Sequence, residues 1–241
     1  MDAGFEYLAY GPASGAPTKL IILLHGYGRS GFYMEKMAQA ARLAVPQALI
    51  LCPHGPEALD TTKIADANTD HFLHIPQELQ GGQNASNTLS RQWFRIDGQL
   101  DQLLPRIRKT AQRLNDFIDA QRDMLGITDR DIVVMGFSQG AGLALYTAFS
   151  RKQEIAGMIC HSAIAVQKPT QDPLLVSKPK TLYLYGDQDG EFTQERYHAT
   201  FKWLQNYTGK KATETKVAGL GHFTNAESRR HCADFMGKVL P

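Results

Sequence analysis

The fold is decided by one stretch of sequence, Ile132-Val133-Val134-Met135-Gly136-Phe137-Ser138-Gln139-Gly140-Ala141-Gly142-Leu143-Ala144-Leu145-Tyr146. Its first four residues predict a buried strand, and the residues after Gly140 predict an apolar helix. Between them, Gly-x-Ser-x-Gly predicts a sharp strand-to-helix turn that lifts the Ser138 hydroxyl clear of the sheet. Glycines at 136 and 140 lack a Cβ, so the strand and the helix can approach each other closely. Ser138 is therefore the candidate nucleophile, and the alternative is a serine that only caps a helix.

Outward from this turn, short apolar runs alternate with longer helical patterns. Residues 20–24, 48–52, 157–160 and 181–185 predict further strands with little polar alternation, as expected of strands covered on both faces. Apolar residues at three- and four-residue spacings predict a helix over residues 100–118. Further helices are predicted over residues 34–43, 140–149, 197–207 and 226–239. The alternation predicts an α/β protein with a mostly parallel central sheet and helices on both of its faces.

Residues 55–91 do not fit this alternation, because they are polar and rich in Asn, Asp, Thr, Gln and Gly. A loop this long is often functional, and this one falls between a strand end and a helix, where α/β proteins place loops over their ligand crevice. We interpret it as a lid-like insertion, or else as a solvated loop with no role. Its apolar residues, candidates for an acyl groove, are Phe72, Leu73, Ile75 and Leu79. No repeat or low-complexity linker divides the chain, so a single domain over residues 1–241 is predicted.

Composition narrows the class of protein. The 241 residues are 43% hydrophobic and 21% charged, and a formal net charge of +2 without a basic cluster argues against a nucleic-acid or membrane-surface partner. Three scattered cysteines, Cys52, Cys160 and Cys232, favour a reducing compartment. The N-terminus has no apolar signal region, and the longest apolar run, residues 20–24, is too short for membrane insertion. A cytoplasmic location is predicted.

A serine nucleophile needs a base, and His222 is the strongest candidate. The acid and the base are expected to follow the serine along the chain in that order. His222 lies in the glycine-rich loop Gly219-Leu220-Gly221-His222, just before the last predicted helix, and loops carried on rigid elements often hold catalytic groups. The other three histidines after the serine have structural interpretations, as the end of a strand or as parts of helices: His161, His198 and His231.

The acid partner is left open by spacing alone. Tyr185-Gly186-Asp187-Gln188-Asp189-Gly190-Glu191 follows a predicted strand and carries three carboxylates. Asp187, Asp189 and Glu191 are all candidates, and any of them could simply be solvated or cap the next helix.

Two backbone N–H groups are candidates for an oxyanion hole. Gln139 follows the nucleophile at the start of a helix, where N–H groups are unpaired and the helix dipole is positive. Tyr27 lies in His25-Gly26-Tyr27-Gly28, a glycine-flanked turn after the first predicted strand, and is the natural second donor. The alternative is an ordinary strand-to-helix turn.

With these residues in hand, the chain resembles the phospholipase/carboxylesterase family of α/β-hydrolases, which includes acyl-protein thioesterases and small carboxylesterases. The matching segments occur in family order from about residue 18 onward: Leu23-Leu24-His25-Gly26-Tyr27-Gly28, Cys52-Pro53-His54-Gly55-Pro56, Trp93-Phe94, Gly136-Phe137-Ser138-Gln139-Gly140-Ala141, Tyr185-Gly186-Asp187-Gln188-Asp189 and Gly219-Leu220-Gly221-His222.

The resemblance implies the α/β-hydrolase fold and a role for each matching residue. Ser138 is then the nucleophile, Asp189 the acid and His222 the base. Two sets of further residues follow from it: the oxyanion donors Tyr27 and Gln139, and Trp93, which matches a tryptophan near the substrate groove. The chain departs from the family where Gly190-Glu191-Phe192-Thr193 follows the acid, which keeps Asp187 and Glu191 as alternatives, and where Tyr185 replaces the usual histidine.

The predicted reaction is hydrolysis of a carboxylic ester, an acyl thioester or a lysophospholipid through an acyl-enzyme on Ser138. The alternatives are a peptidase or polyester depolymerase on the same fold, and a non-catalytic binding protein that keeps the fold. No metal or organic cofactor is expected, since Asp70, His71 and His74 provide only an isolated H-x-x-H. The expected partner is a small acyl substrate, and both a monomer and a homodimer are left open.

Overall fold

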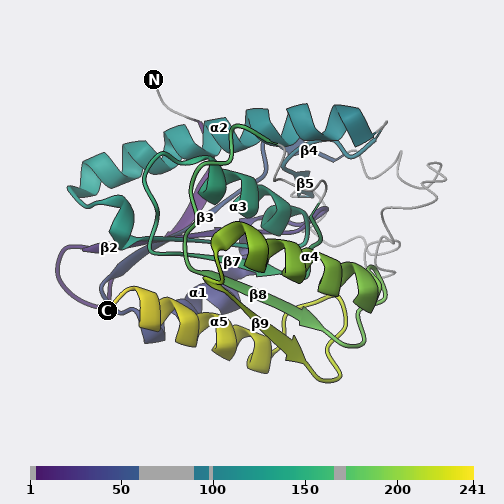
Figure 1. Ribbon diagram of the computed structural model, residues 1–241. Helices are drawn as coiled ribbons and strands as arrows, with labels where there is room; N and C mark the ends of the chain where they lie inside the picture. The colour runs from purple at the N-terminus through teal and green to yellow at the C-terminus, as the bar shows by residue number, and fades with distance from the viewer. Residues whose placement is uncertain (1–3, 60–89, 98–99, 166–171) are drawn as a thin grey trace.

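A seven-stranded sheet forms the centre of the molecule, seen in a computed structural model that describes residues 4–59, 90–97, 100–165 and 172–241 (Figure 1). Its strands lie in the order β1-β3-β2-β6-β7-β8-β9. All neighbours are parallel except β1 and β3, which are antiparallel. The strands are β1 (Tyr7–Tyr10), β2 (Lys19–Leu24), β3 (Ala48–Pro53), β6 (Ile132–Phe137), β7 (Gly157–His161), β8 (Thr181–Gly186) and β9 (Ala212–Val217). The mostly parallel α/β architecture predicted from the sequence is confirmed.

Helices cover both faces of the sheet. In Figure 1, α1 and α5 lie together below the sheet, and α2, α3 and α4 lie above it. The helices are α1 (Glu35–Ala44), α2 (Leu100–Leu125), α3 (Gln139–Ser150), α4 (Gln194–Thr208) and α5 (Ala226–Val239), with short 3-10 turns η1 (Gly31–Met34) and η5 (Asp129–Asp131). Within the described residues, no helix is both long and apolar enough to cross a bilayer.

Alternate residues of each central strand face the two layers. Leu20, Ile22 and Leu24 of β2 pack in the core beneath α2, α3 and α4, and Ile21 and Leu23 pack in the core over α1 and α5. All five side chains are fully buried. Strands buried on both faces therefore read as continuous apolar runs, which is why they could be recognised from the sequence.

The sequence pattern does not predict the two edge strands, β1 and β9. β1 has a half-exposed pattern, and β9 (Ala-Thr-Glu-Thr-Lys-Val) is buried mainly at its two ends. Edge strands face water along one side and carry polar residues, so neither has an apolar run.

The sheet topology brings two loops together at its centre. Connections run outward in one direction from β2 to β3, and in the other direction from β6 through β9. The switch lies between β2 and β6, where Leu24 is paired with Gly136. Open α/β sheets bind ligands at the carboxyl ends of the strands at such a point.

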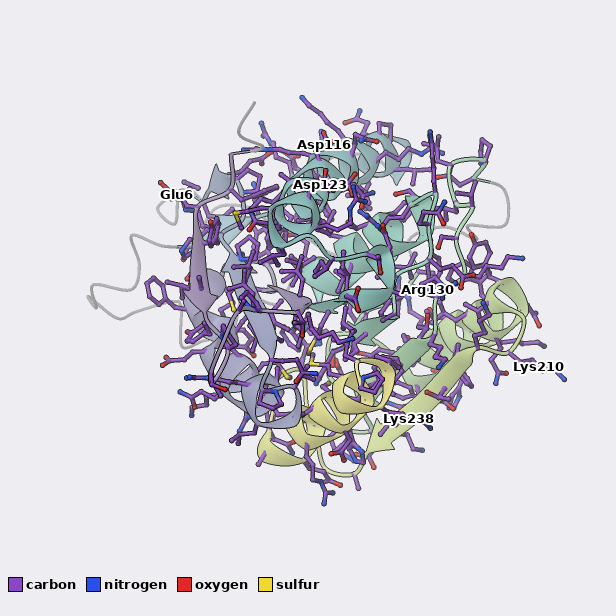
Figure 2. All side chains as sticks on the ribbon, turned by 90° about the vertical axis from the view of Figure 1, so that its left-hand side faces the viewer. Glu6, Asp116, Asp123, Arg130, Lys210 and Lys238 are labelled. Carbon is purple, nitrogen blue, oxygen red and sulfur yellow. The ribbon has the colours of Figure 1, made fainter. Side chains whose placement is uncertain are left out.

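Charged side chains of both signs project from the outer surface. Figure 2 labels six of them, which are spread over the view and do not gather in one patch. They are Glu6, Asp116, Asp123, Arg130, Lys210 and Lys238.

Candidate active site

Ser138 lies in a strained turn between β6 and α3. Its backbone has φ 52° and ψ −120°, a conformation that costs energy for any residue with a Cβ. A Cβ on Gly136 would overlap the backbone of Gly140, so the chain can close this turn only with glycine at that position. The Ser138 side chain makes no capping hydrogen bond to α3, so the helix-capping alternative does not describe it.

Three side chains from separate loops form a continuous hydrogen-bonded series. The Ser138 hydroxyl lies 2.9 Å from Nε2 of His222, and Nδ1 of His222 lies 2.8 Å from Oδ2 of Asp189. These residues follow β6, β9 and β8 respectively. With the carboxylate accepting from Nδ1–H, Nε2 has a free lone pair that can take the serine proton.

Asp189 is held on all sides by donors. Its side chain has no solvent exposure, its Oδ1 accepts the N–H groups of Glu191 at 2.9 Å and Phe192 at 3.3 Å, and its Oδ2 accepts the hydroxyl of Tyr197 at 2.6 Å. Burial raises the pKa of Asp189, but the hydrogen bonds from His222, Tyr197 and the Glu191 N–H outweigh it and keep the pKa below its usual value. The carboxylate is thus kept ionised without contact with water.

The other two acid candidates make different contacts. Asp187 accepts the N–H of Gly219 through Oδ1 at 2.7 Å, which joins the acid loop to the histidine loop. Glu191 contributes its backbone N–H to Asp189. Of the three carboxylates, the one in contact with His222 is that of Asp189.

The His222 ring packs against two aromatic rings. The centroid of Phe137 is 5.1 Å away and that of Phe192 is 5.7 Å away. His161 is fully buried at the end of β7, and His198 packs on α4 beside Tyr185. Neither takes the place of His222 beside the serine.

The turn after β2 is fixed by buried polar contacts. Nε2 of His25 accepts the Gly55 N–H at 2.9 Å, and Nδ1 lies 2.7 Å from the carbonyl of Gly26, to which it donates. Burial lowers the pKa of His25 to about 3, so the ring is neutral and can play both parts. Among the described residues, no group accepts the N–H of Tyr27 or of Gln139. Both N–H groups are therefore available to an oxyanion.

The Gln139 side chain has a contact role that its position in the motif did not reveal. Its Oε1 accepts the Trp93 N–H at 3.0 Å, and its Nε2 donates to the Phe94 carbonyl at 2.8 Å. The Trp93 indole N–H in turn donates to the His25 carbonyl at 2.7 Å. These contacts join the strand-to-helix turn at Ser138, hereafter the elbow, to the turn after β2 through Trp93 and Phe94.

Trp93, which the resemblance places near the substrate groove, has a fully buried side chain. The indole packs on the His25 ring, with centroids 4.8 Å apart. It supports the turn that carries Tyr27.

The insertion is closed at its base. β4 (Glu57–Ala58) pairs with β5 (Arg91–Gln92) in an antiparallel ladder, and the Leu59 N–H donates to the Ser90 carbonyl. Two ends of the predicted loop over residues 55–91 are therefore short strands. The predicted acyl-groove residues 72–79 and the H-x-x-H of residues 71–74 lie outside the described residues.

Comparison with known proteins places this geometry in a family. The phospholipase/carboxylesterase family profile matches residues 10–72 and 74–240. The chain belongs to this family. Acyl-protein thioesterase 1 of Mycosarcoma maydis is 24% identical over 244 residues, which cover 97% of each chain. Acyl-protein thioesterase 1 of Kluyveromyces lactis is 26% identical over 153 residues, which cover 61% of this chain and 66% of that protein.

Solved structures show the same fold. Esterase PE8 has a TM-score of 0.80 at 22% identity, covering 98% of this chain and 99% of its own. The carboxylesterase of Bacillus cereus has a TM-score of 0.69 at 16% identity, covering 98% and 94%. The α/β-hydrolase fold is confirmed, and membership of the phospholipase/carboxylesterase family makes this chain a serine hydrolase of esterase or thioesterase type.

Proposed function

We propose that this enzyme hydrolyses acyl esters and acyl thioesters through an acyl-enzyme on Ser138. One observation carries the proposal: the Ser138 hydroxyl, both ring nitrogens of His222 and the Asp189 carboxylate form one hydrogen-bonded series. A serine hydroxyl is a poor nucleophile until a base in this position removes its proton.

The reaction follows from these contacts. His222 takes the proton of Ser138 through Nε2 as the serine oxygen attacks the acyl carbonyl carbon. The N–H groups of Tyr27 and Gln139 bind the negative oxygen, and His222 then gives its proton to the leaving alkoxide or thiolate. Water, activated by the same histidine, releases the acid and restores Ser138.

Ester and thioester substrates are favoured over the peptide alternative by the named relatives, which are acyl-protein thioesterases and a carboxylesterase. We also propose that residues 1–241 act as one domain, since both apolar cores share one sheet. The proposal includes a cytoplasmic location, supported by three cysteines that are all buried as free thiols.

A substrate panel with Ser138→Ala tests the function. p-Nitrophenyl esters of increasing chain length, an acyl-CoA thioester, a lysophospholipid and short peptide p-nitroanilides are compared by kcat/KM. We expect turnover of esters and thioesters and none of the peptides, with kcat about 10⁶-fold lower in Ser138→Ala. The control is Ser150→Ala at the end of α3, which should keep full activity. Ester hydrolysis that survives in Ser138→Ala would refute the proposal.

A further inference from the structure

A buried hydrogen-bonded chain continues beyond the Asp189 carboxylate. The Tyr197 hydroxyl, on α4, lies 2.6 Å from Oδ2 of Asp189, the oxygen that also contacts His222. Burial raises the pKa of Tyr197, and hydrogen bonding from the Ser162 hydroxyl works against that rise. The Ser162 hydroxyl lies 2.9 Å from Nδ1 of His161. No part of the proposed acyl transfer requires these three residues.

The proton positions along this chain follow from the number of protons available. An ionised Asp189 can only accept, so Tyr197 must donate its one proton to it. The Tyr197 oxygen then accepts from Ser162, and the Ser162 oxygen accepts from Nδ1–H of His161. This tautomer leaves a lone pair and not an N–H on Nε2 of His161, a buried atom with no partner among the described residues. Every donor in the chain thus points toward Asp189.

Packing and backbone geometry restrain Tyr197 and Ser162, the middle members of this chain. The Tyr197 side chain is fully buried, and its ring stacks on Tyr185 at 4.3 Å with planes 7° apart. Tyr185, which stands where the family has a histidine, is itself anchored by a 2.7 Å hydrogen bond to Glu214. Ser162 has φ 53°, which a residue with a Cβ adopts only at a cost. Strain held at a buried serine points to a role for its hydroxyl.

The His161–Ser162 segment also touches the nucleophile. The Ser138 N–H donates to the His161 carbonyl at 2.9 Å. One segment at the end of β7 therefore supports the nucleophile through its backbone and the acid through its side chains.

We propose that Tyr197, supported by Ser162 and His161, is a positioning residue that holds the Asp189 carboxylate against His222 and draws negative charge away from it. The inference rests on the proposed function. A second strong donor on Oδ2 fixes the direction of that oxygen, and it lowers the affinity of the carboxylate for the imidazolium proton. The proton on His222 is then released more easily to the leaving group. The other titratable groups packed around this cluster are Tyr183, Tyr185, Glu214, Arg196 and His198.

Tyr197→Phe tests the inference with p-nitrophenyl butyrate as the probe. The ring stack stays and only the hydroxyl is lost. We expect kcat to fall about tenfold with KM within about twofold, since loss of one hydrogen bond to a charged group corresponds to about that factor. The acidic limb of the kcat/KM pH profile should move to higher pH, because a more negative Asp189 holds the His222 proton more tightly.

The matched control is Tyr183→Phe, which also removes a buried hydroxyl, one that donates to the Ala163 carbonyl in the same aromatic cluster. It should change neither kcat nor the pH profile. A loss of stability alone would affect both variants without moving the acidic limb.

Ser162→Gly provides a second test, since glycine tolerates the positive φ and removes the supporting hydroxyl. We expect a smaller shift of the acidic limb in the same direction. A folded Tyr197→Phe with wild-type kcat and pH profile overturns the inference. If Tyr197→Phe does not fold, an unshifted profile in Ser162→Gly overturns it. Ser138→Ala separates the two proposals, since its inactivity supports the function whatever the Tyr197 result.

Discussion

Gly140→Ala tests whether the close approach of α3 and β2 builds the site. A Cβ at Gly140 would lie 2.5 Å from the Leu24 carbonyl oxygen and would also overlap the carbonyl of His25. Carbon and oxygen keep about 3.4 Å between them, so α3 would have to move by about 1 Å. Overpacking of this kind costs about 1–3 kcal/mol, or roughly 2–12 °C in Tm for a chain of this size.

The same movement would displace the elbow from the turn after β2. A misplacement of about 1 Å at a catalytic group can cost about 10²-fold in rate. We therefore expect kcat of Gly140→Ala on p-nitrophenyl butyrate to fall by about that factor. Calorimetry gives the change in Tm, and steady-state kinetics gives kcat.

Gly142→Ala is the matched control, two residues further along the same helix. A Cβ there meets no atom within 4 Å. Replacing a helical glycine by alanine should stabilise the protein by up to about 1 kcal/mol and leave kcat unchanged. Equal effects of the two substitutions on Tm and kcat would show that the close approach of α3 and β2 does not build the site.

Three further predictions concern the catalytic acid, the side-chain contacts of Gln139 and the dependence of stability on pH. Asp189→Asn should lower kcat about 10⁴-fold in ester assays. The kcat of Asp187→Asn, whose amide oxygen can still accept the Gly219 N–H, should stay within a few-fold of wild type. The reverse order would identify Asp187 as the acid. Gln139→Ala loses two hydrogen bonds to neighbouring backbone and should lower the free energy of unfolding by about 1–3 kcal/mol in urea titrations. An unchanged midpoint would contradict a stabilising role for these two hydrogen bonds. Burial lowers the pKa of His25 and of His161 from 6.5 to about 3, so the unfolded chain binds more protons than the folded one between those pH values. Tm should therefore fall as the pH drops from about 6.5 toward 3. A flat Tm over that window would contradict the burial of both rings in their neutral form.

The sequence was most informative where burial leaves an unbroken signal. β6 is apolar on both faces, and the strain at Ser138 demands glycines at fixed offsets, so strand, turn and helix could all be expected from one stretch. β9 has polar residues along an edge, and nothing in its composition separates it from a loop. Periodicity therefore identified the centre of the sheet and missed its edges.

The spacing of residues along the sequence does not predict contacts between residues that are far apart in the chain. Asp187 and Asp189 are only two residues apart, but they make different contacts. Asp189 bonds His222, 33 positions later in the chain, whereas Asp187 accepts the Gly219 N–H. Tyr197 reads as one aromatic among several on a helix, and only the packing of α4 brings its hydroxyl to the acid. The resemblance implies a place for Trp93 near the substrate groove, and only the packed structure shows that its indole N–H donates to the His25 carbonyl.

Acylation of Ser138 during turnover can be tested with a fluorophosphonate probe followed by peptide mass spectrometry. The expected result is one phosphonate per chain, located on Ser138, with no labelling of Ser138→Ala under the same conditions. Labelling of Ser138→Ala at the wild-type rate, or an adduct on another residue of the wild-type enzyme, would contradict it.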